Sequence, residues 1–182
     1  MQLKWSHTLI YVQNMDEMLD FYTNVLGFEV ADRGDLGGNG IAFLSQVETD
    51  HHQFAFLETR KDQAPSNNVG HFAFRVDDLD DVKAMHATLS SDDRVSNIRP
   101  TTHGNTWSVY FNDPEGNGIE IFCDSPWHVA QPQGKPWDTS LDNETVFEQT
   151  EAQFAAEPEF GPIEDFYARR AAHLAQREGK AT

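Results

Sequence analysis

The sequence predicts an α+β fold in which two tandem β-α-β-β-β modules form one curved mixed sheet, followed by a C-terminal helical extension. The pattern of one strand, one helix and three strands occurs twice, over residues 3–60 and 70–123. Residues 61–68, between the two repeats, have the polar composition of a loop. Two weakly similar modules in tandem are an internal repeat, and this repeat is the basis of the predicted fold.

Length and composition indicate a globular protein. Its 182 residues are enough for one sizeable core or two small fused modules. The net charge of −17 argues against binding to nucleic acid and to anionic membrane surfaces, because both favour basic patches. We expect neither a membrane span nor a secretory signal, because no apolar run is long enough for a span and Met1 leads directly into a strand-like segment. The single cysteine, Cys123, excludes an internal disulfide and predicts a cytoplasmic location.

The first module follows the order β-α-β-β-β. Residues 3–13 alternate as a strand, and this strand carries His7. Asn14 and Glu17 have the spacing of a capping box, and apolar residues at helical spacing follow until Gly27, a typical helix end. We expect three further strands, over residues 28–33, 41–47 and 53–59.

The second module repeats this order. Its first strand, over residues 70–76, carries His71 in the place that His7 has in the first module. Asp77 and Asp78 then precede a helix, whose apolar face consists of Leu79, Val82, Met85 and Leu89. Three strands follow, over residues 94–101, 106–111 and 119–122, and a cluster of turn-forming residues separates the last two.

The character of the chain changes at Pro126. We therefore expect one domain over residues 1–125 and an extension over residues 126–182. Residues 126–137 are too rich in proline for regular structure and are predicted to run over the surface. Two helices are expected after them, over residues 144–156 and 162–177, and their apolar faces predict a homo-oligomer. Three further histidines are expected on the surface, without a functional role: His86, His128 and His173.

Glu120 lies in the middle of the last predicted strand of the second module, between Ile119 and Ile121. A carboxylate in this position is costly to bury unless a cationic group meets it. No Lys or Arg lies close to it in the sequence, so a metal ion is one candidate partner. The alternative is a carboxylate that points outward from a half-exposed strand.

The repeat adds two histidines to the metal hypothesis. Taken alone, a histidine at the start of a strand is more often structural than a metal ligand. His7 and His71, however, hold equivalent positions in two related strands, and such positions would come together across a pseudo-twofold axis. With Glu120 they would supply two imidazoles and one carboxylate, the facial triad of non-haem Fe(II) oxygenases. The predicted sheet would then surround a metal site.

The chain resembles the vicinal oxygen chelate superfamily, which comprises glyoxalases, fosfomycin and bleomycin resistance proteins and extradiol dioxygenases. The resemblance covers residues 3–123. Two stretches carry it at the level of the superfamily: Phe21-Tyr22-Thr23-Asn24-Val25-Leu26-Gly27-Phe28, and Asp113-Pro114-Glu115-Gly116-Asn117 followed by Glu120. More specific features resemble one-domain type I extradiol ring-cleavage dioxygenases: the pair His51-His52 before a strand, Tyr110 ahead of Glu120, and His103 upstream of Tyr110.

This resemblance implies an Fe(II)-dependent extradiol (meta) cleavage of a catechol by dioxygen, a reaction of aromatic hydrocarbon catabolism. It implies that the metal, Fe(II) or alternatively Mn(II), is bound by His7, His71 and Glu120. It also implies His52 as the acid-base catalyst, with His103 and Tyr110 in contact with the catechol oxygens. His103 lies closer to Tyr110 than the family pattern has it.

Without the resemblance, these residues have simpler interpretations. His51 and His52 would be a solvated pair in a loop, and Tyr110 would be a core aromatic residue whose hydroxyl group reaches the surface. A non-catalytic small-molecule binding protein of the same fold is then an alternative. The intact set of His7, His71 and Glu120 argues against that alternative, because binding-only relatives lack it.

A second alternative is a glyoxalase-type metal isomerase or a thiol transferase of the resistance class. Such enzymes commonly take a fourth protein ligand from the last strand of the first module. Phe54, Ala55 and Phe56 at the centre of that strand cannot bind a metal, which favours the three-ligand site. Gln53 and Glu58 at its ends keep this alternative open.

Overall fold

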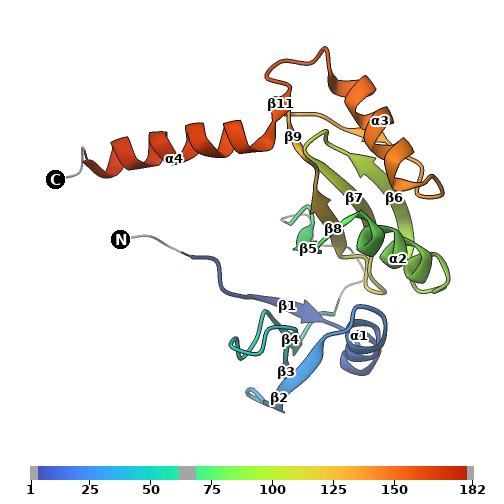
Figure 1. The fold of residues 1–182 in the computed structure, drawn as a ribbon. Coiled ribbons are helices and arrows are strands. Elements are labelled where there is room, and N and C mark those ends of the chain that lie inside the picture. Colours follow the sequence, from blue (N-terminus) through green and yellow to red (C-terminus); the bar gives the residue numbers. More distant parts are fainter. Residues whose placement is uncertain (1–3, 62–68, 180–182) are drawn as a thin grey trace. The chain divides into compact units, whose positions relative to one another are not determined.

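The computed structural model describes residues 4–61 and 69–179, and it shows two compact units (Figure 1). Unit 1 contains the described residues of the range 1–70, together with residues 92–96 and 112–118. Unit 2 contains residues 71–91 and 97–111 and the described residues from 119 onward. Leu3 and most of the predicted linker, residues 62–68, lie outside the described residues.

Unit 1 has a four-stranded mixed sheet with one helical segment. The strands, in the order β1-β4-β3-β2, are β1 (Thr8–Val12), β4 (Phe54–Glu58), β3 (Gly40–Ser45) and β2 (Glu29–Asp35). β1 and β4 are parallel, and the other pairs are antiparallel. The helix α1 (Met15–Asp20) continues as a π-helix, η1 (Phe21–Val25). Its buried side chains form the core of unit 1 with one face of the sheet: Met18, Leu19, Phe21 and Tyr22.

The ends of this helical segment follow the sequence signals. Asn14 caps α1, since its side chain accepts a hydrogen bond from the Glu17 backbone at 3.2 Å. The Glu17 carboxylate accepts from the side-chain amide of Asn14 at 3.2 Å, whereas the Asn14 backbone N–H donates to Glu115 at 2.9 Å. The predicted cap at Asn14 is therefore confirmed, but the return bond that completes a capping box is not formed. Gly27 follows the π-helix with a φ of 79°, a conformation that glycine adopts without steric cost.

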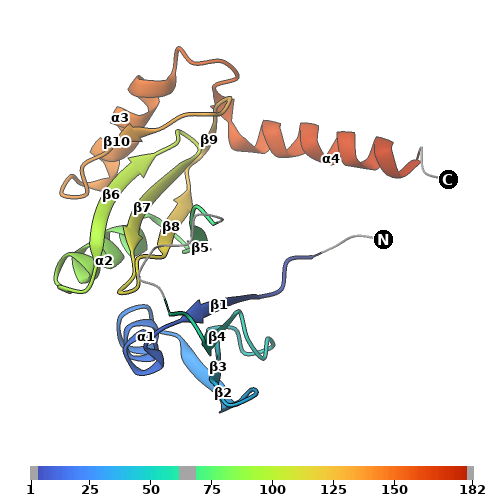
Figure 2. The same cartoon turned by 180° about the vertical axis from the view of Figure 1, so that it is seen from behind.

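Unit 2 has a five-stranded mixed sheet, with helices in addition (Figure 2). Its strand order is β10-β6-β7-β8-β5, and β5 is parallel to β8. The strands are β5 (Phe72–Arg75), β6 (Ser96–Thr102), β7 (Thr106–Asn112), β8 (Gly118–Asp124) and β10 (Lys135–Pro136). The helices are α2 (Leu79–Ser90), α3 (Asn143–Phe154) and α4 (Ile163–Gly179). Asp78 caps α2 by accepting hydrogen bonds from the backbones of Asp80 and Asp81.

The two sheets show the predicted internal repeat. The order β1-β4-β3-β2 in unit 1 corresponds to β5-β8-β7-β6 in unit 2, and in both units the first strand is parallel to the last. The predicted α+β class with mixed sheets is confirmed. The two repeats form separate sheets, a four-stranded one in unit 1 and a five-stranded one in unit 2, whereas the sequence predicted a single sheet. The reason is that each module pairs its own first and last strands.

The proline-rich stretch after Pro126 differs from its prediction. It forms two short strands: β9 (Trp127–His128), which pairs with β11 (Gly161–Pro162), and β10, which pairs with β6. Val129 is fully buried, and Gly104 permits this, because a Cβ on Gly104 would lie 2.5 Å from the Val129 side chain. The stretch is therefore held by tertiary packing that its proline content does not reveal.

The prediction of a surface position for His128 is also wrong. Only 7% of its surface is exposed, because its ring stacks on Phe166 of α4 at 3.9 Å between centroids. Its Nε2 lies 3.2 Å from the Glu159 carboxylate. Beyond this contact, α4 extends away from the rest of unit 2 (Figures 1 and 2). Within residues 4–61 and 69–179, every helix is too short or too polar to span a lipid bilayer.

Candidate metal centre

Glu120 is the buried carboxylate of unit 2. It lies in β8 and is only 8% exposed, so it does not point outward into solvent. Its Oε1 accepts a hydrogen bond from the Ser108 hydroxyl at 2.6 Å, and its Oε2 lies 3.2 Å from Nε2 of His71. The cost of burying this carboxylate is therefore offset by polar partners, one of which is an imidazole.

The parallel pairing of β5 with β8 explains why these two side chains meet. Glu120 is paired with Ala73, and His71 precedes Ala73 by two residues. Side chains two apart in an extended segment share a face, as do cross-strand neighbours. Ile119 and Ile121 point to the other face and are buried in the core. The strand register thus places His71 and Glu120 on the same face of the sheet.

The structure also places His103 and Tyr110 in this part of unit 2. Nε2 of His103 lies 2.9 Å from the Tyr110 hydroxyl, and its Nδ1 contacts the Gln133 carbonyl oxygen. A carbonyl can only accept, so Nδ1 of His103 carries a proton and donates it, while the Tyr110 hydroxyl lies within hydrogen-bond distance of Nε2. Burial raises the pKa of Tyr110, and Glu120 raises it further by hydrogen bonding and by charge repulsion. Tyr110 therefore remains a protonated hydroxyl, and His103 lies 4.0 Å from Glu120.

Ser108 is the one partner in this group that sequence reasoning missed. It is fully buried in β7, two residues before Tyr110, and so it shares the face of Tyr110. That alternation was the signal in the sequence. Ser108 lies between the apolar residues Trp107 and Val109, so it points to the face of the sheet opposite theirs. A serine in such a position indicates a polar partner on that face.

Unit 1 contains a cluster of three histidines. The rings of His7 and His52 lie 4.2 Å apart between centroids, and Nδ1 of His52 lies 3.0 Å from Nδ1 of His51. Nε2 of His51 in turn lies 2.9 Å from the Asp32 carboxylate. Partial burial lowers the pKa of His52, and the neighbouring His7 and His51 lower it further. His52 is therefore a neutral imidazole at neutral pH.

The position in unit 1 that corresponds to Glu120 is Ala55. His7 directly precedes β1, in which Leu9 pairs with Ala55, just as His71 precedes β5, in which Ala73 pairs with Glu120. Ala55 has no atom that could bind a metal. The register of unit 1 therefore provides no carboxylate at the place where unit 2 provides Glu120.

The two end residues of β4 are occupied by other contacts. Glu58 is paired with Val12, which is fully buried, and its carboxylate accepts a hydrogen bond from the Met15 backbone at the start of α1. Glu58 therefore points to the helix side of the sheet. The side-chain oxygen of Gln53 accepts a hydrogen bond from the Gln46 backbone at 2.8 Å. Neither contact favours a role as fourth ligand.

The donor set of unit 2 fits a metal ion. Two ligand atoms bound at right angles, each at about 2.1 Å, are about 3 Å apart, and Nε2 of His71 and Oε2 of Glu120 are 3.2 Å apart. His7, the third predicted ligand, belongs to unit 1. In the part of the chain that the structure describes, no three His, Cys, Asp or Glu side chains form a group that could hold a metal ion. The union of His7 with His71 and Glu120 in one centre stays a prediction.

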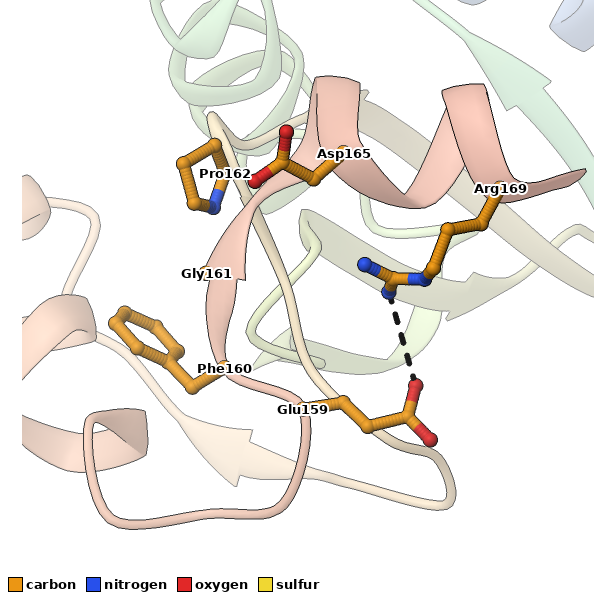
Figure 3. A pocket seen from close by; sticks show the side chains of 6 residues that line it. All are labelled: Glu159, Phe160, Gly161, Pro162, Asp165 and Arg169. Carbon is orange, nitrogen blue, oxygen red and sulfur yellow. Dashed lines mark ion pairs between the residues drawn. The ribbon is translucent and has the colours of Figure 1, made fainter.

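A separate cavity lies in unit 2 at the start of α4 (Figure 3). It has a volume of about 440 Å³, and an ion pair of 4.0 Å between Arg169 and Glu159 crosses it. The lining residues are Glu159, Phe160, Gly161, Pro162, Asp165 and Arg169. None of the predicted site residues is among them, so the candidate metal centre does not depend on this cavity.

Comparison with known proteins relates the chain to one superfamily and to more than one reaction. The family model of the Glyoxalase/Bleomycin resistance protein/Dioxygenase superfamily matches residues 4–121. Metapyrocatechase of Pseudomonas sp. (strain CF600) is 28% identical over 138 residues, which are 74% of this chain and 44% of that protein. Biphenyl-2,3-diol 1,2-dioxygenase 2 of Rhodococcus globerulus is 29% identical over 67% of this chain and 63% of that protein. The chain thus spans roughly half of the length of these two dioxygenases.

A lactoylglutathione lyase of Neisseria meningitidis is also similar, at 30% identity over 63% of this chain and 86% of that protein. Among solved structures, a glyoxylase/bleomycin resistance protein/dioxygenase domain from Frankia sp. EAN1pec has a TM-score of 0.57 at 18% identity, over 69% of this chain and all of that chain. The fosfomycin resistance protein FosX from Listeria monocytogenes, complexed with Mn(II) and sulfate, has a TM-score of 0.54 at 16% identity, over 69% and 95% of the two chains. These structural similarities concern the fold alone.

Proposed function

This chain belongs to the glyoxalase/bleomycin resistance protein/dioxygenase superfamily, and we propose that it is an extradiol dioxygenase that opens a catechol ring beside the two hydroxylated carbons. Dioxygenases and a lyase are both similar to it, so membership alone does not decide the reaction. The observation that carries the proposal is Ala55, which stands at the position of unit 1 that corresponds to Glu120.

The missing fourth carboxylate matters because of the number of positions that stay open. With His7, His71 and Glu120 as ligands, an octahedral ion has three further positions. A catechol bound through both oxygens would fill two, and dioxygen would fill the third. A fourth protein ligand would leave only two positions, which is enough for a chelating substrate but not for dioxygen as well. The register of β4 therefore favours the dioxygenase over an isomerase or a transferase.

Fe(II) is the metal we propose, with Mn(II) as the alternative, because both accept imidazole nitrogen and carboxylate oxygen. When bound, the metal would supply Lewis acidity toward the catechol and the path for electrons from the ring to dioxygen. His71 and Glu120 would hold it from unit 2, and His7 would hold it from unit 1. The hydrogen bond from Ser108 holds Oε1 of Glu120, so Oε2, which faces His71, is the oxygen that would hold the metal.

Two residues have the protonation states that the reaction requires. His52 is neutral, so its imidazole can take a proton from a catechol hydroxyl and return it to an oxygen later in the reaction. Tyr110 is protonated, and its hydroxyl can donate a hydrogen bond to an anionic catechol oxygen when it turns from His103. Both oxygen atoms of dioxygen enter the ring-opened product, so no other reductant is needed.

Anaerobic reconstitution with Fe(II), followed by 2,3-dihydroxybiphenyl or catechol in air, tests this function. The expected result is a yellow ring-opened product, which a His71→Ala variant does not form. His173→Ala is the matched control, because this histidine is exposed on α4 and should leave the activity unchanged. Stoichiometric metal without product from either catechol would favour the isomerase or transferase. A chain that binds no metal would leave only a non-catalytic binding protein.

A further inference from the structure

The strand β2 contains an irregularity that changes which face Asp32 occupies. Val30 pairs with Leu44 of β3, and Asp32 pairs with the next residue, Phe43, so Ala31 is an extra residue, a β-bulge. Leu44 is fully buried on the core face of the sheet, so Val30 points to that face. Without the bulge, Asp32 would share the face of Val30, because side chains alternate along a strand. The bulge turns Asp32 to the other face.

That other face is the one that carries the histidines. Asp32 forms one cross-strand row with Phe43, Ala55 and Leu9, which continue through β3, β4 and β1. The Phe43 ring lies 5.0 Å from the ring of His52 and 5.4 Å from that of His51. The bulge thus places a carboxylate beside the two histidines instead of against the core.

The hydrogen bonds along this cluster determine the protons of each ring. A carboxylate only accepts, so Nε2 of His51 donates to Asp32 at 2.9 Å. The Nδ1 of a neutral His51 then has no proton and accepts from Nδ1 of His52 at 3.0 Å. In a neutral His52 the proton lies on Nδ1, so Nε2 carries the lone pair. The tautomer follows from Asp32 through two hydrogen bonds.

We propose that Asp32 and His51 are positioning residues, which hold His52 in the tautomer whose Nε2 can act as the base. The inference rests on the proposed function for its catalytic meaning, whereas the tautomer itself does not depend on any reaction. In this arrangement Asp32 and His51 touch neither substrate nor metal. They orient the imidazole ring and keep its Nδ1 as the donor.

The exposure of the pair argues against a role in stability. The side chains of His51 and Asp32 are 55% and 68% exposed, and ion pairs with this exposure contribute little to folding. β-Bulges are over-represented next to active sites, where they re-aim a side chain, as this bulge does with Asp32. The exposure also makes the test clean, because Asp32 can be replaced without disturbing the core.

The first test is the tautomer of His52, measured by the ¹⁵N and ¹³C chemical shifts of its ring. The full chain is used with metal removed by chelation, since Fe(II) would broaden the resonances, and His52→Gln assigns the signals. We expect the Nδ1-protonated form in the wild type. In Asp32→Asn we expect a shift toward the Nε2-protonated form, which Asp32→Glu restores. Glu29→Gln, which removes one charge from the same strand, is the matched control. An unchanged tautomer in Asp32→Asn would overturn the proposal.

The second test is the kinetics of ring cleavage by the Fe(II) enzyme. Asp32→Asn and His51→Ala should lower kcat by about 10-fold to 100-fold, the range typical of residues that orient a ligand or base. KM for the catechol should change by less than about 2-fold, because neither residue contacts the substrate. Equal loss in Glu29→Gln would overturn the proposal. If the tautomer responds to Asp32 but the wild type cleaves no catechol, the positioning role stands and the dioxygenase function fails.

Discussion

The two units share one strand arrangement and differ in what they place on it. In unit 2, the strand that pairs in parallel with the first strand presents Glu120 to His71. In unit 1, the same position is Ala55, and the polar groups come instead from the loop before β4 and from a bulge in β2. The repeat therefore fixes where side chains can meet, while the residues at each position decide the chemistry.

The polar side chains of the two units also suit two different chemical roles. Unit 2 holds a buried carboxylate with a serine, a histidine and a tyrosine, which suits metal binding and the fixing of an anionic substrate. Unit 1 holds a neutral imidazole, His52, oriented by exposed partners, which suits proton transfer. Two halves with the same strand arrangement can thus carry different chemistry, because a register position, a loop and a bulge differ between them.

The largest expected effect comes from removing the side chain that distinguishes unit 2. Glu120→Gln takes away the negative charge and leaves the amide beside Ser108 and His71. We expect the affinity for Fe(II) to fall by more than about 100-fold and ring cleavage to disappear. Metal titration by calorimetry under anaerobic conditions measures the first effect. Retention of wild-type affinity would show that Glu120 is a structural carboxylate held by Ser108.

The converse change gives unit 1 the residue of unit 2. In Ala55→Glu the new carboxylate enters a position that is 1% exposed, so we expect a loss of about 2–4 kcal/mol in the free energy of unfolding without metal. Added Mn(II) should recover part of that loss, because a bound cation compensates the buried charge. Ring cleavage should vanish although metal is bound. Thermal unfolding with and without Mn(II), beside the absorbance assay, checks both effects. Full activity in this variant would contradict the argument from open positions.

Most of the elements in the two units, and the equivalent positions of His7 and His71, could be predicted from the sequence, because they depend on local signals. The alternation of residues around Glu120, the cap at Asn14 and Gly27 after the helix each gave the correct element. Equivalent positions for His7 and His71 followed from the repeat, and the parallel pairing of β1 with β4 and of β5 with β8 bears out that equivalence.

What the sequence could not reveal depends on contacts between distant residues. The bulge at Ala31 has no glycine or proline to indicate it, so the face of Asp32 was not predictable. The burial of His128 and Val129 depends on Phe166 and Gly104, which lie far from them along the chain. The helix spans differ from their predictions at the ends, and the strands β9 to β11 were not predicted at all, because tertiary packing and not local propensity decides them.

Tyr110 sharpens the comparison within unit 2. Tyr110→Phe removes the hydroxyl that lies beside Nε2 of His103 and Glu120, and it keeps the ring beside His71. We expect kcat to fall by about 10-fold to 100-fold, with unchanged affinity for Fe(II), because the hydroxyl is not a ligand. Tyr11→Phe is the matched control in unit 1, since that side chain is 59% exposed on β1. A loss of metal affinity in Tyr110→Phe would mean that the tyrosine supports the centre itself.

The smallest effect concerns Arg94, in the segment of residues 92–96 that belongs to unit 1. Arg94 pairs with Asp92 at 2.6 Å and with Asp20 at 2.7 Å, and its hydrogen bonds lower the pKa of both carboxyl groups below 3.8. A lowered pKa in the folded state gives stability that is present above pH 3.8 and is lost as the pH falls through the folded values. Arg94→Met should therefore lower the urea midpoint at pH 7, and its difference from the wild type should shrink as the pH falls through the folded pKa values of the two carboxyl groups. Arg169→Met in unit 2, whose exposed partner Glu159 lies 4.0 Å away, should shift the midpoint less at every pH. Equal shifts in the two variants would contradict this expectation. The ion pairs of Arg94, although closer and less exposed, would then stabilise the fold no more than the long surface contact of Arg169.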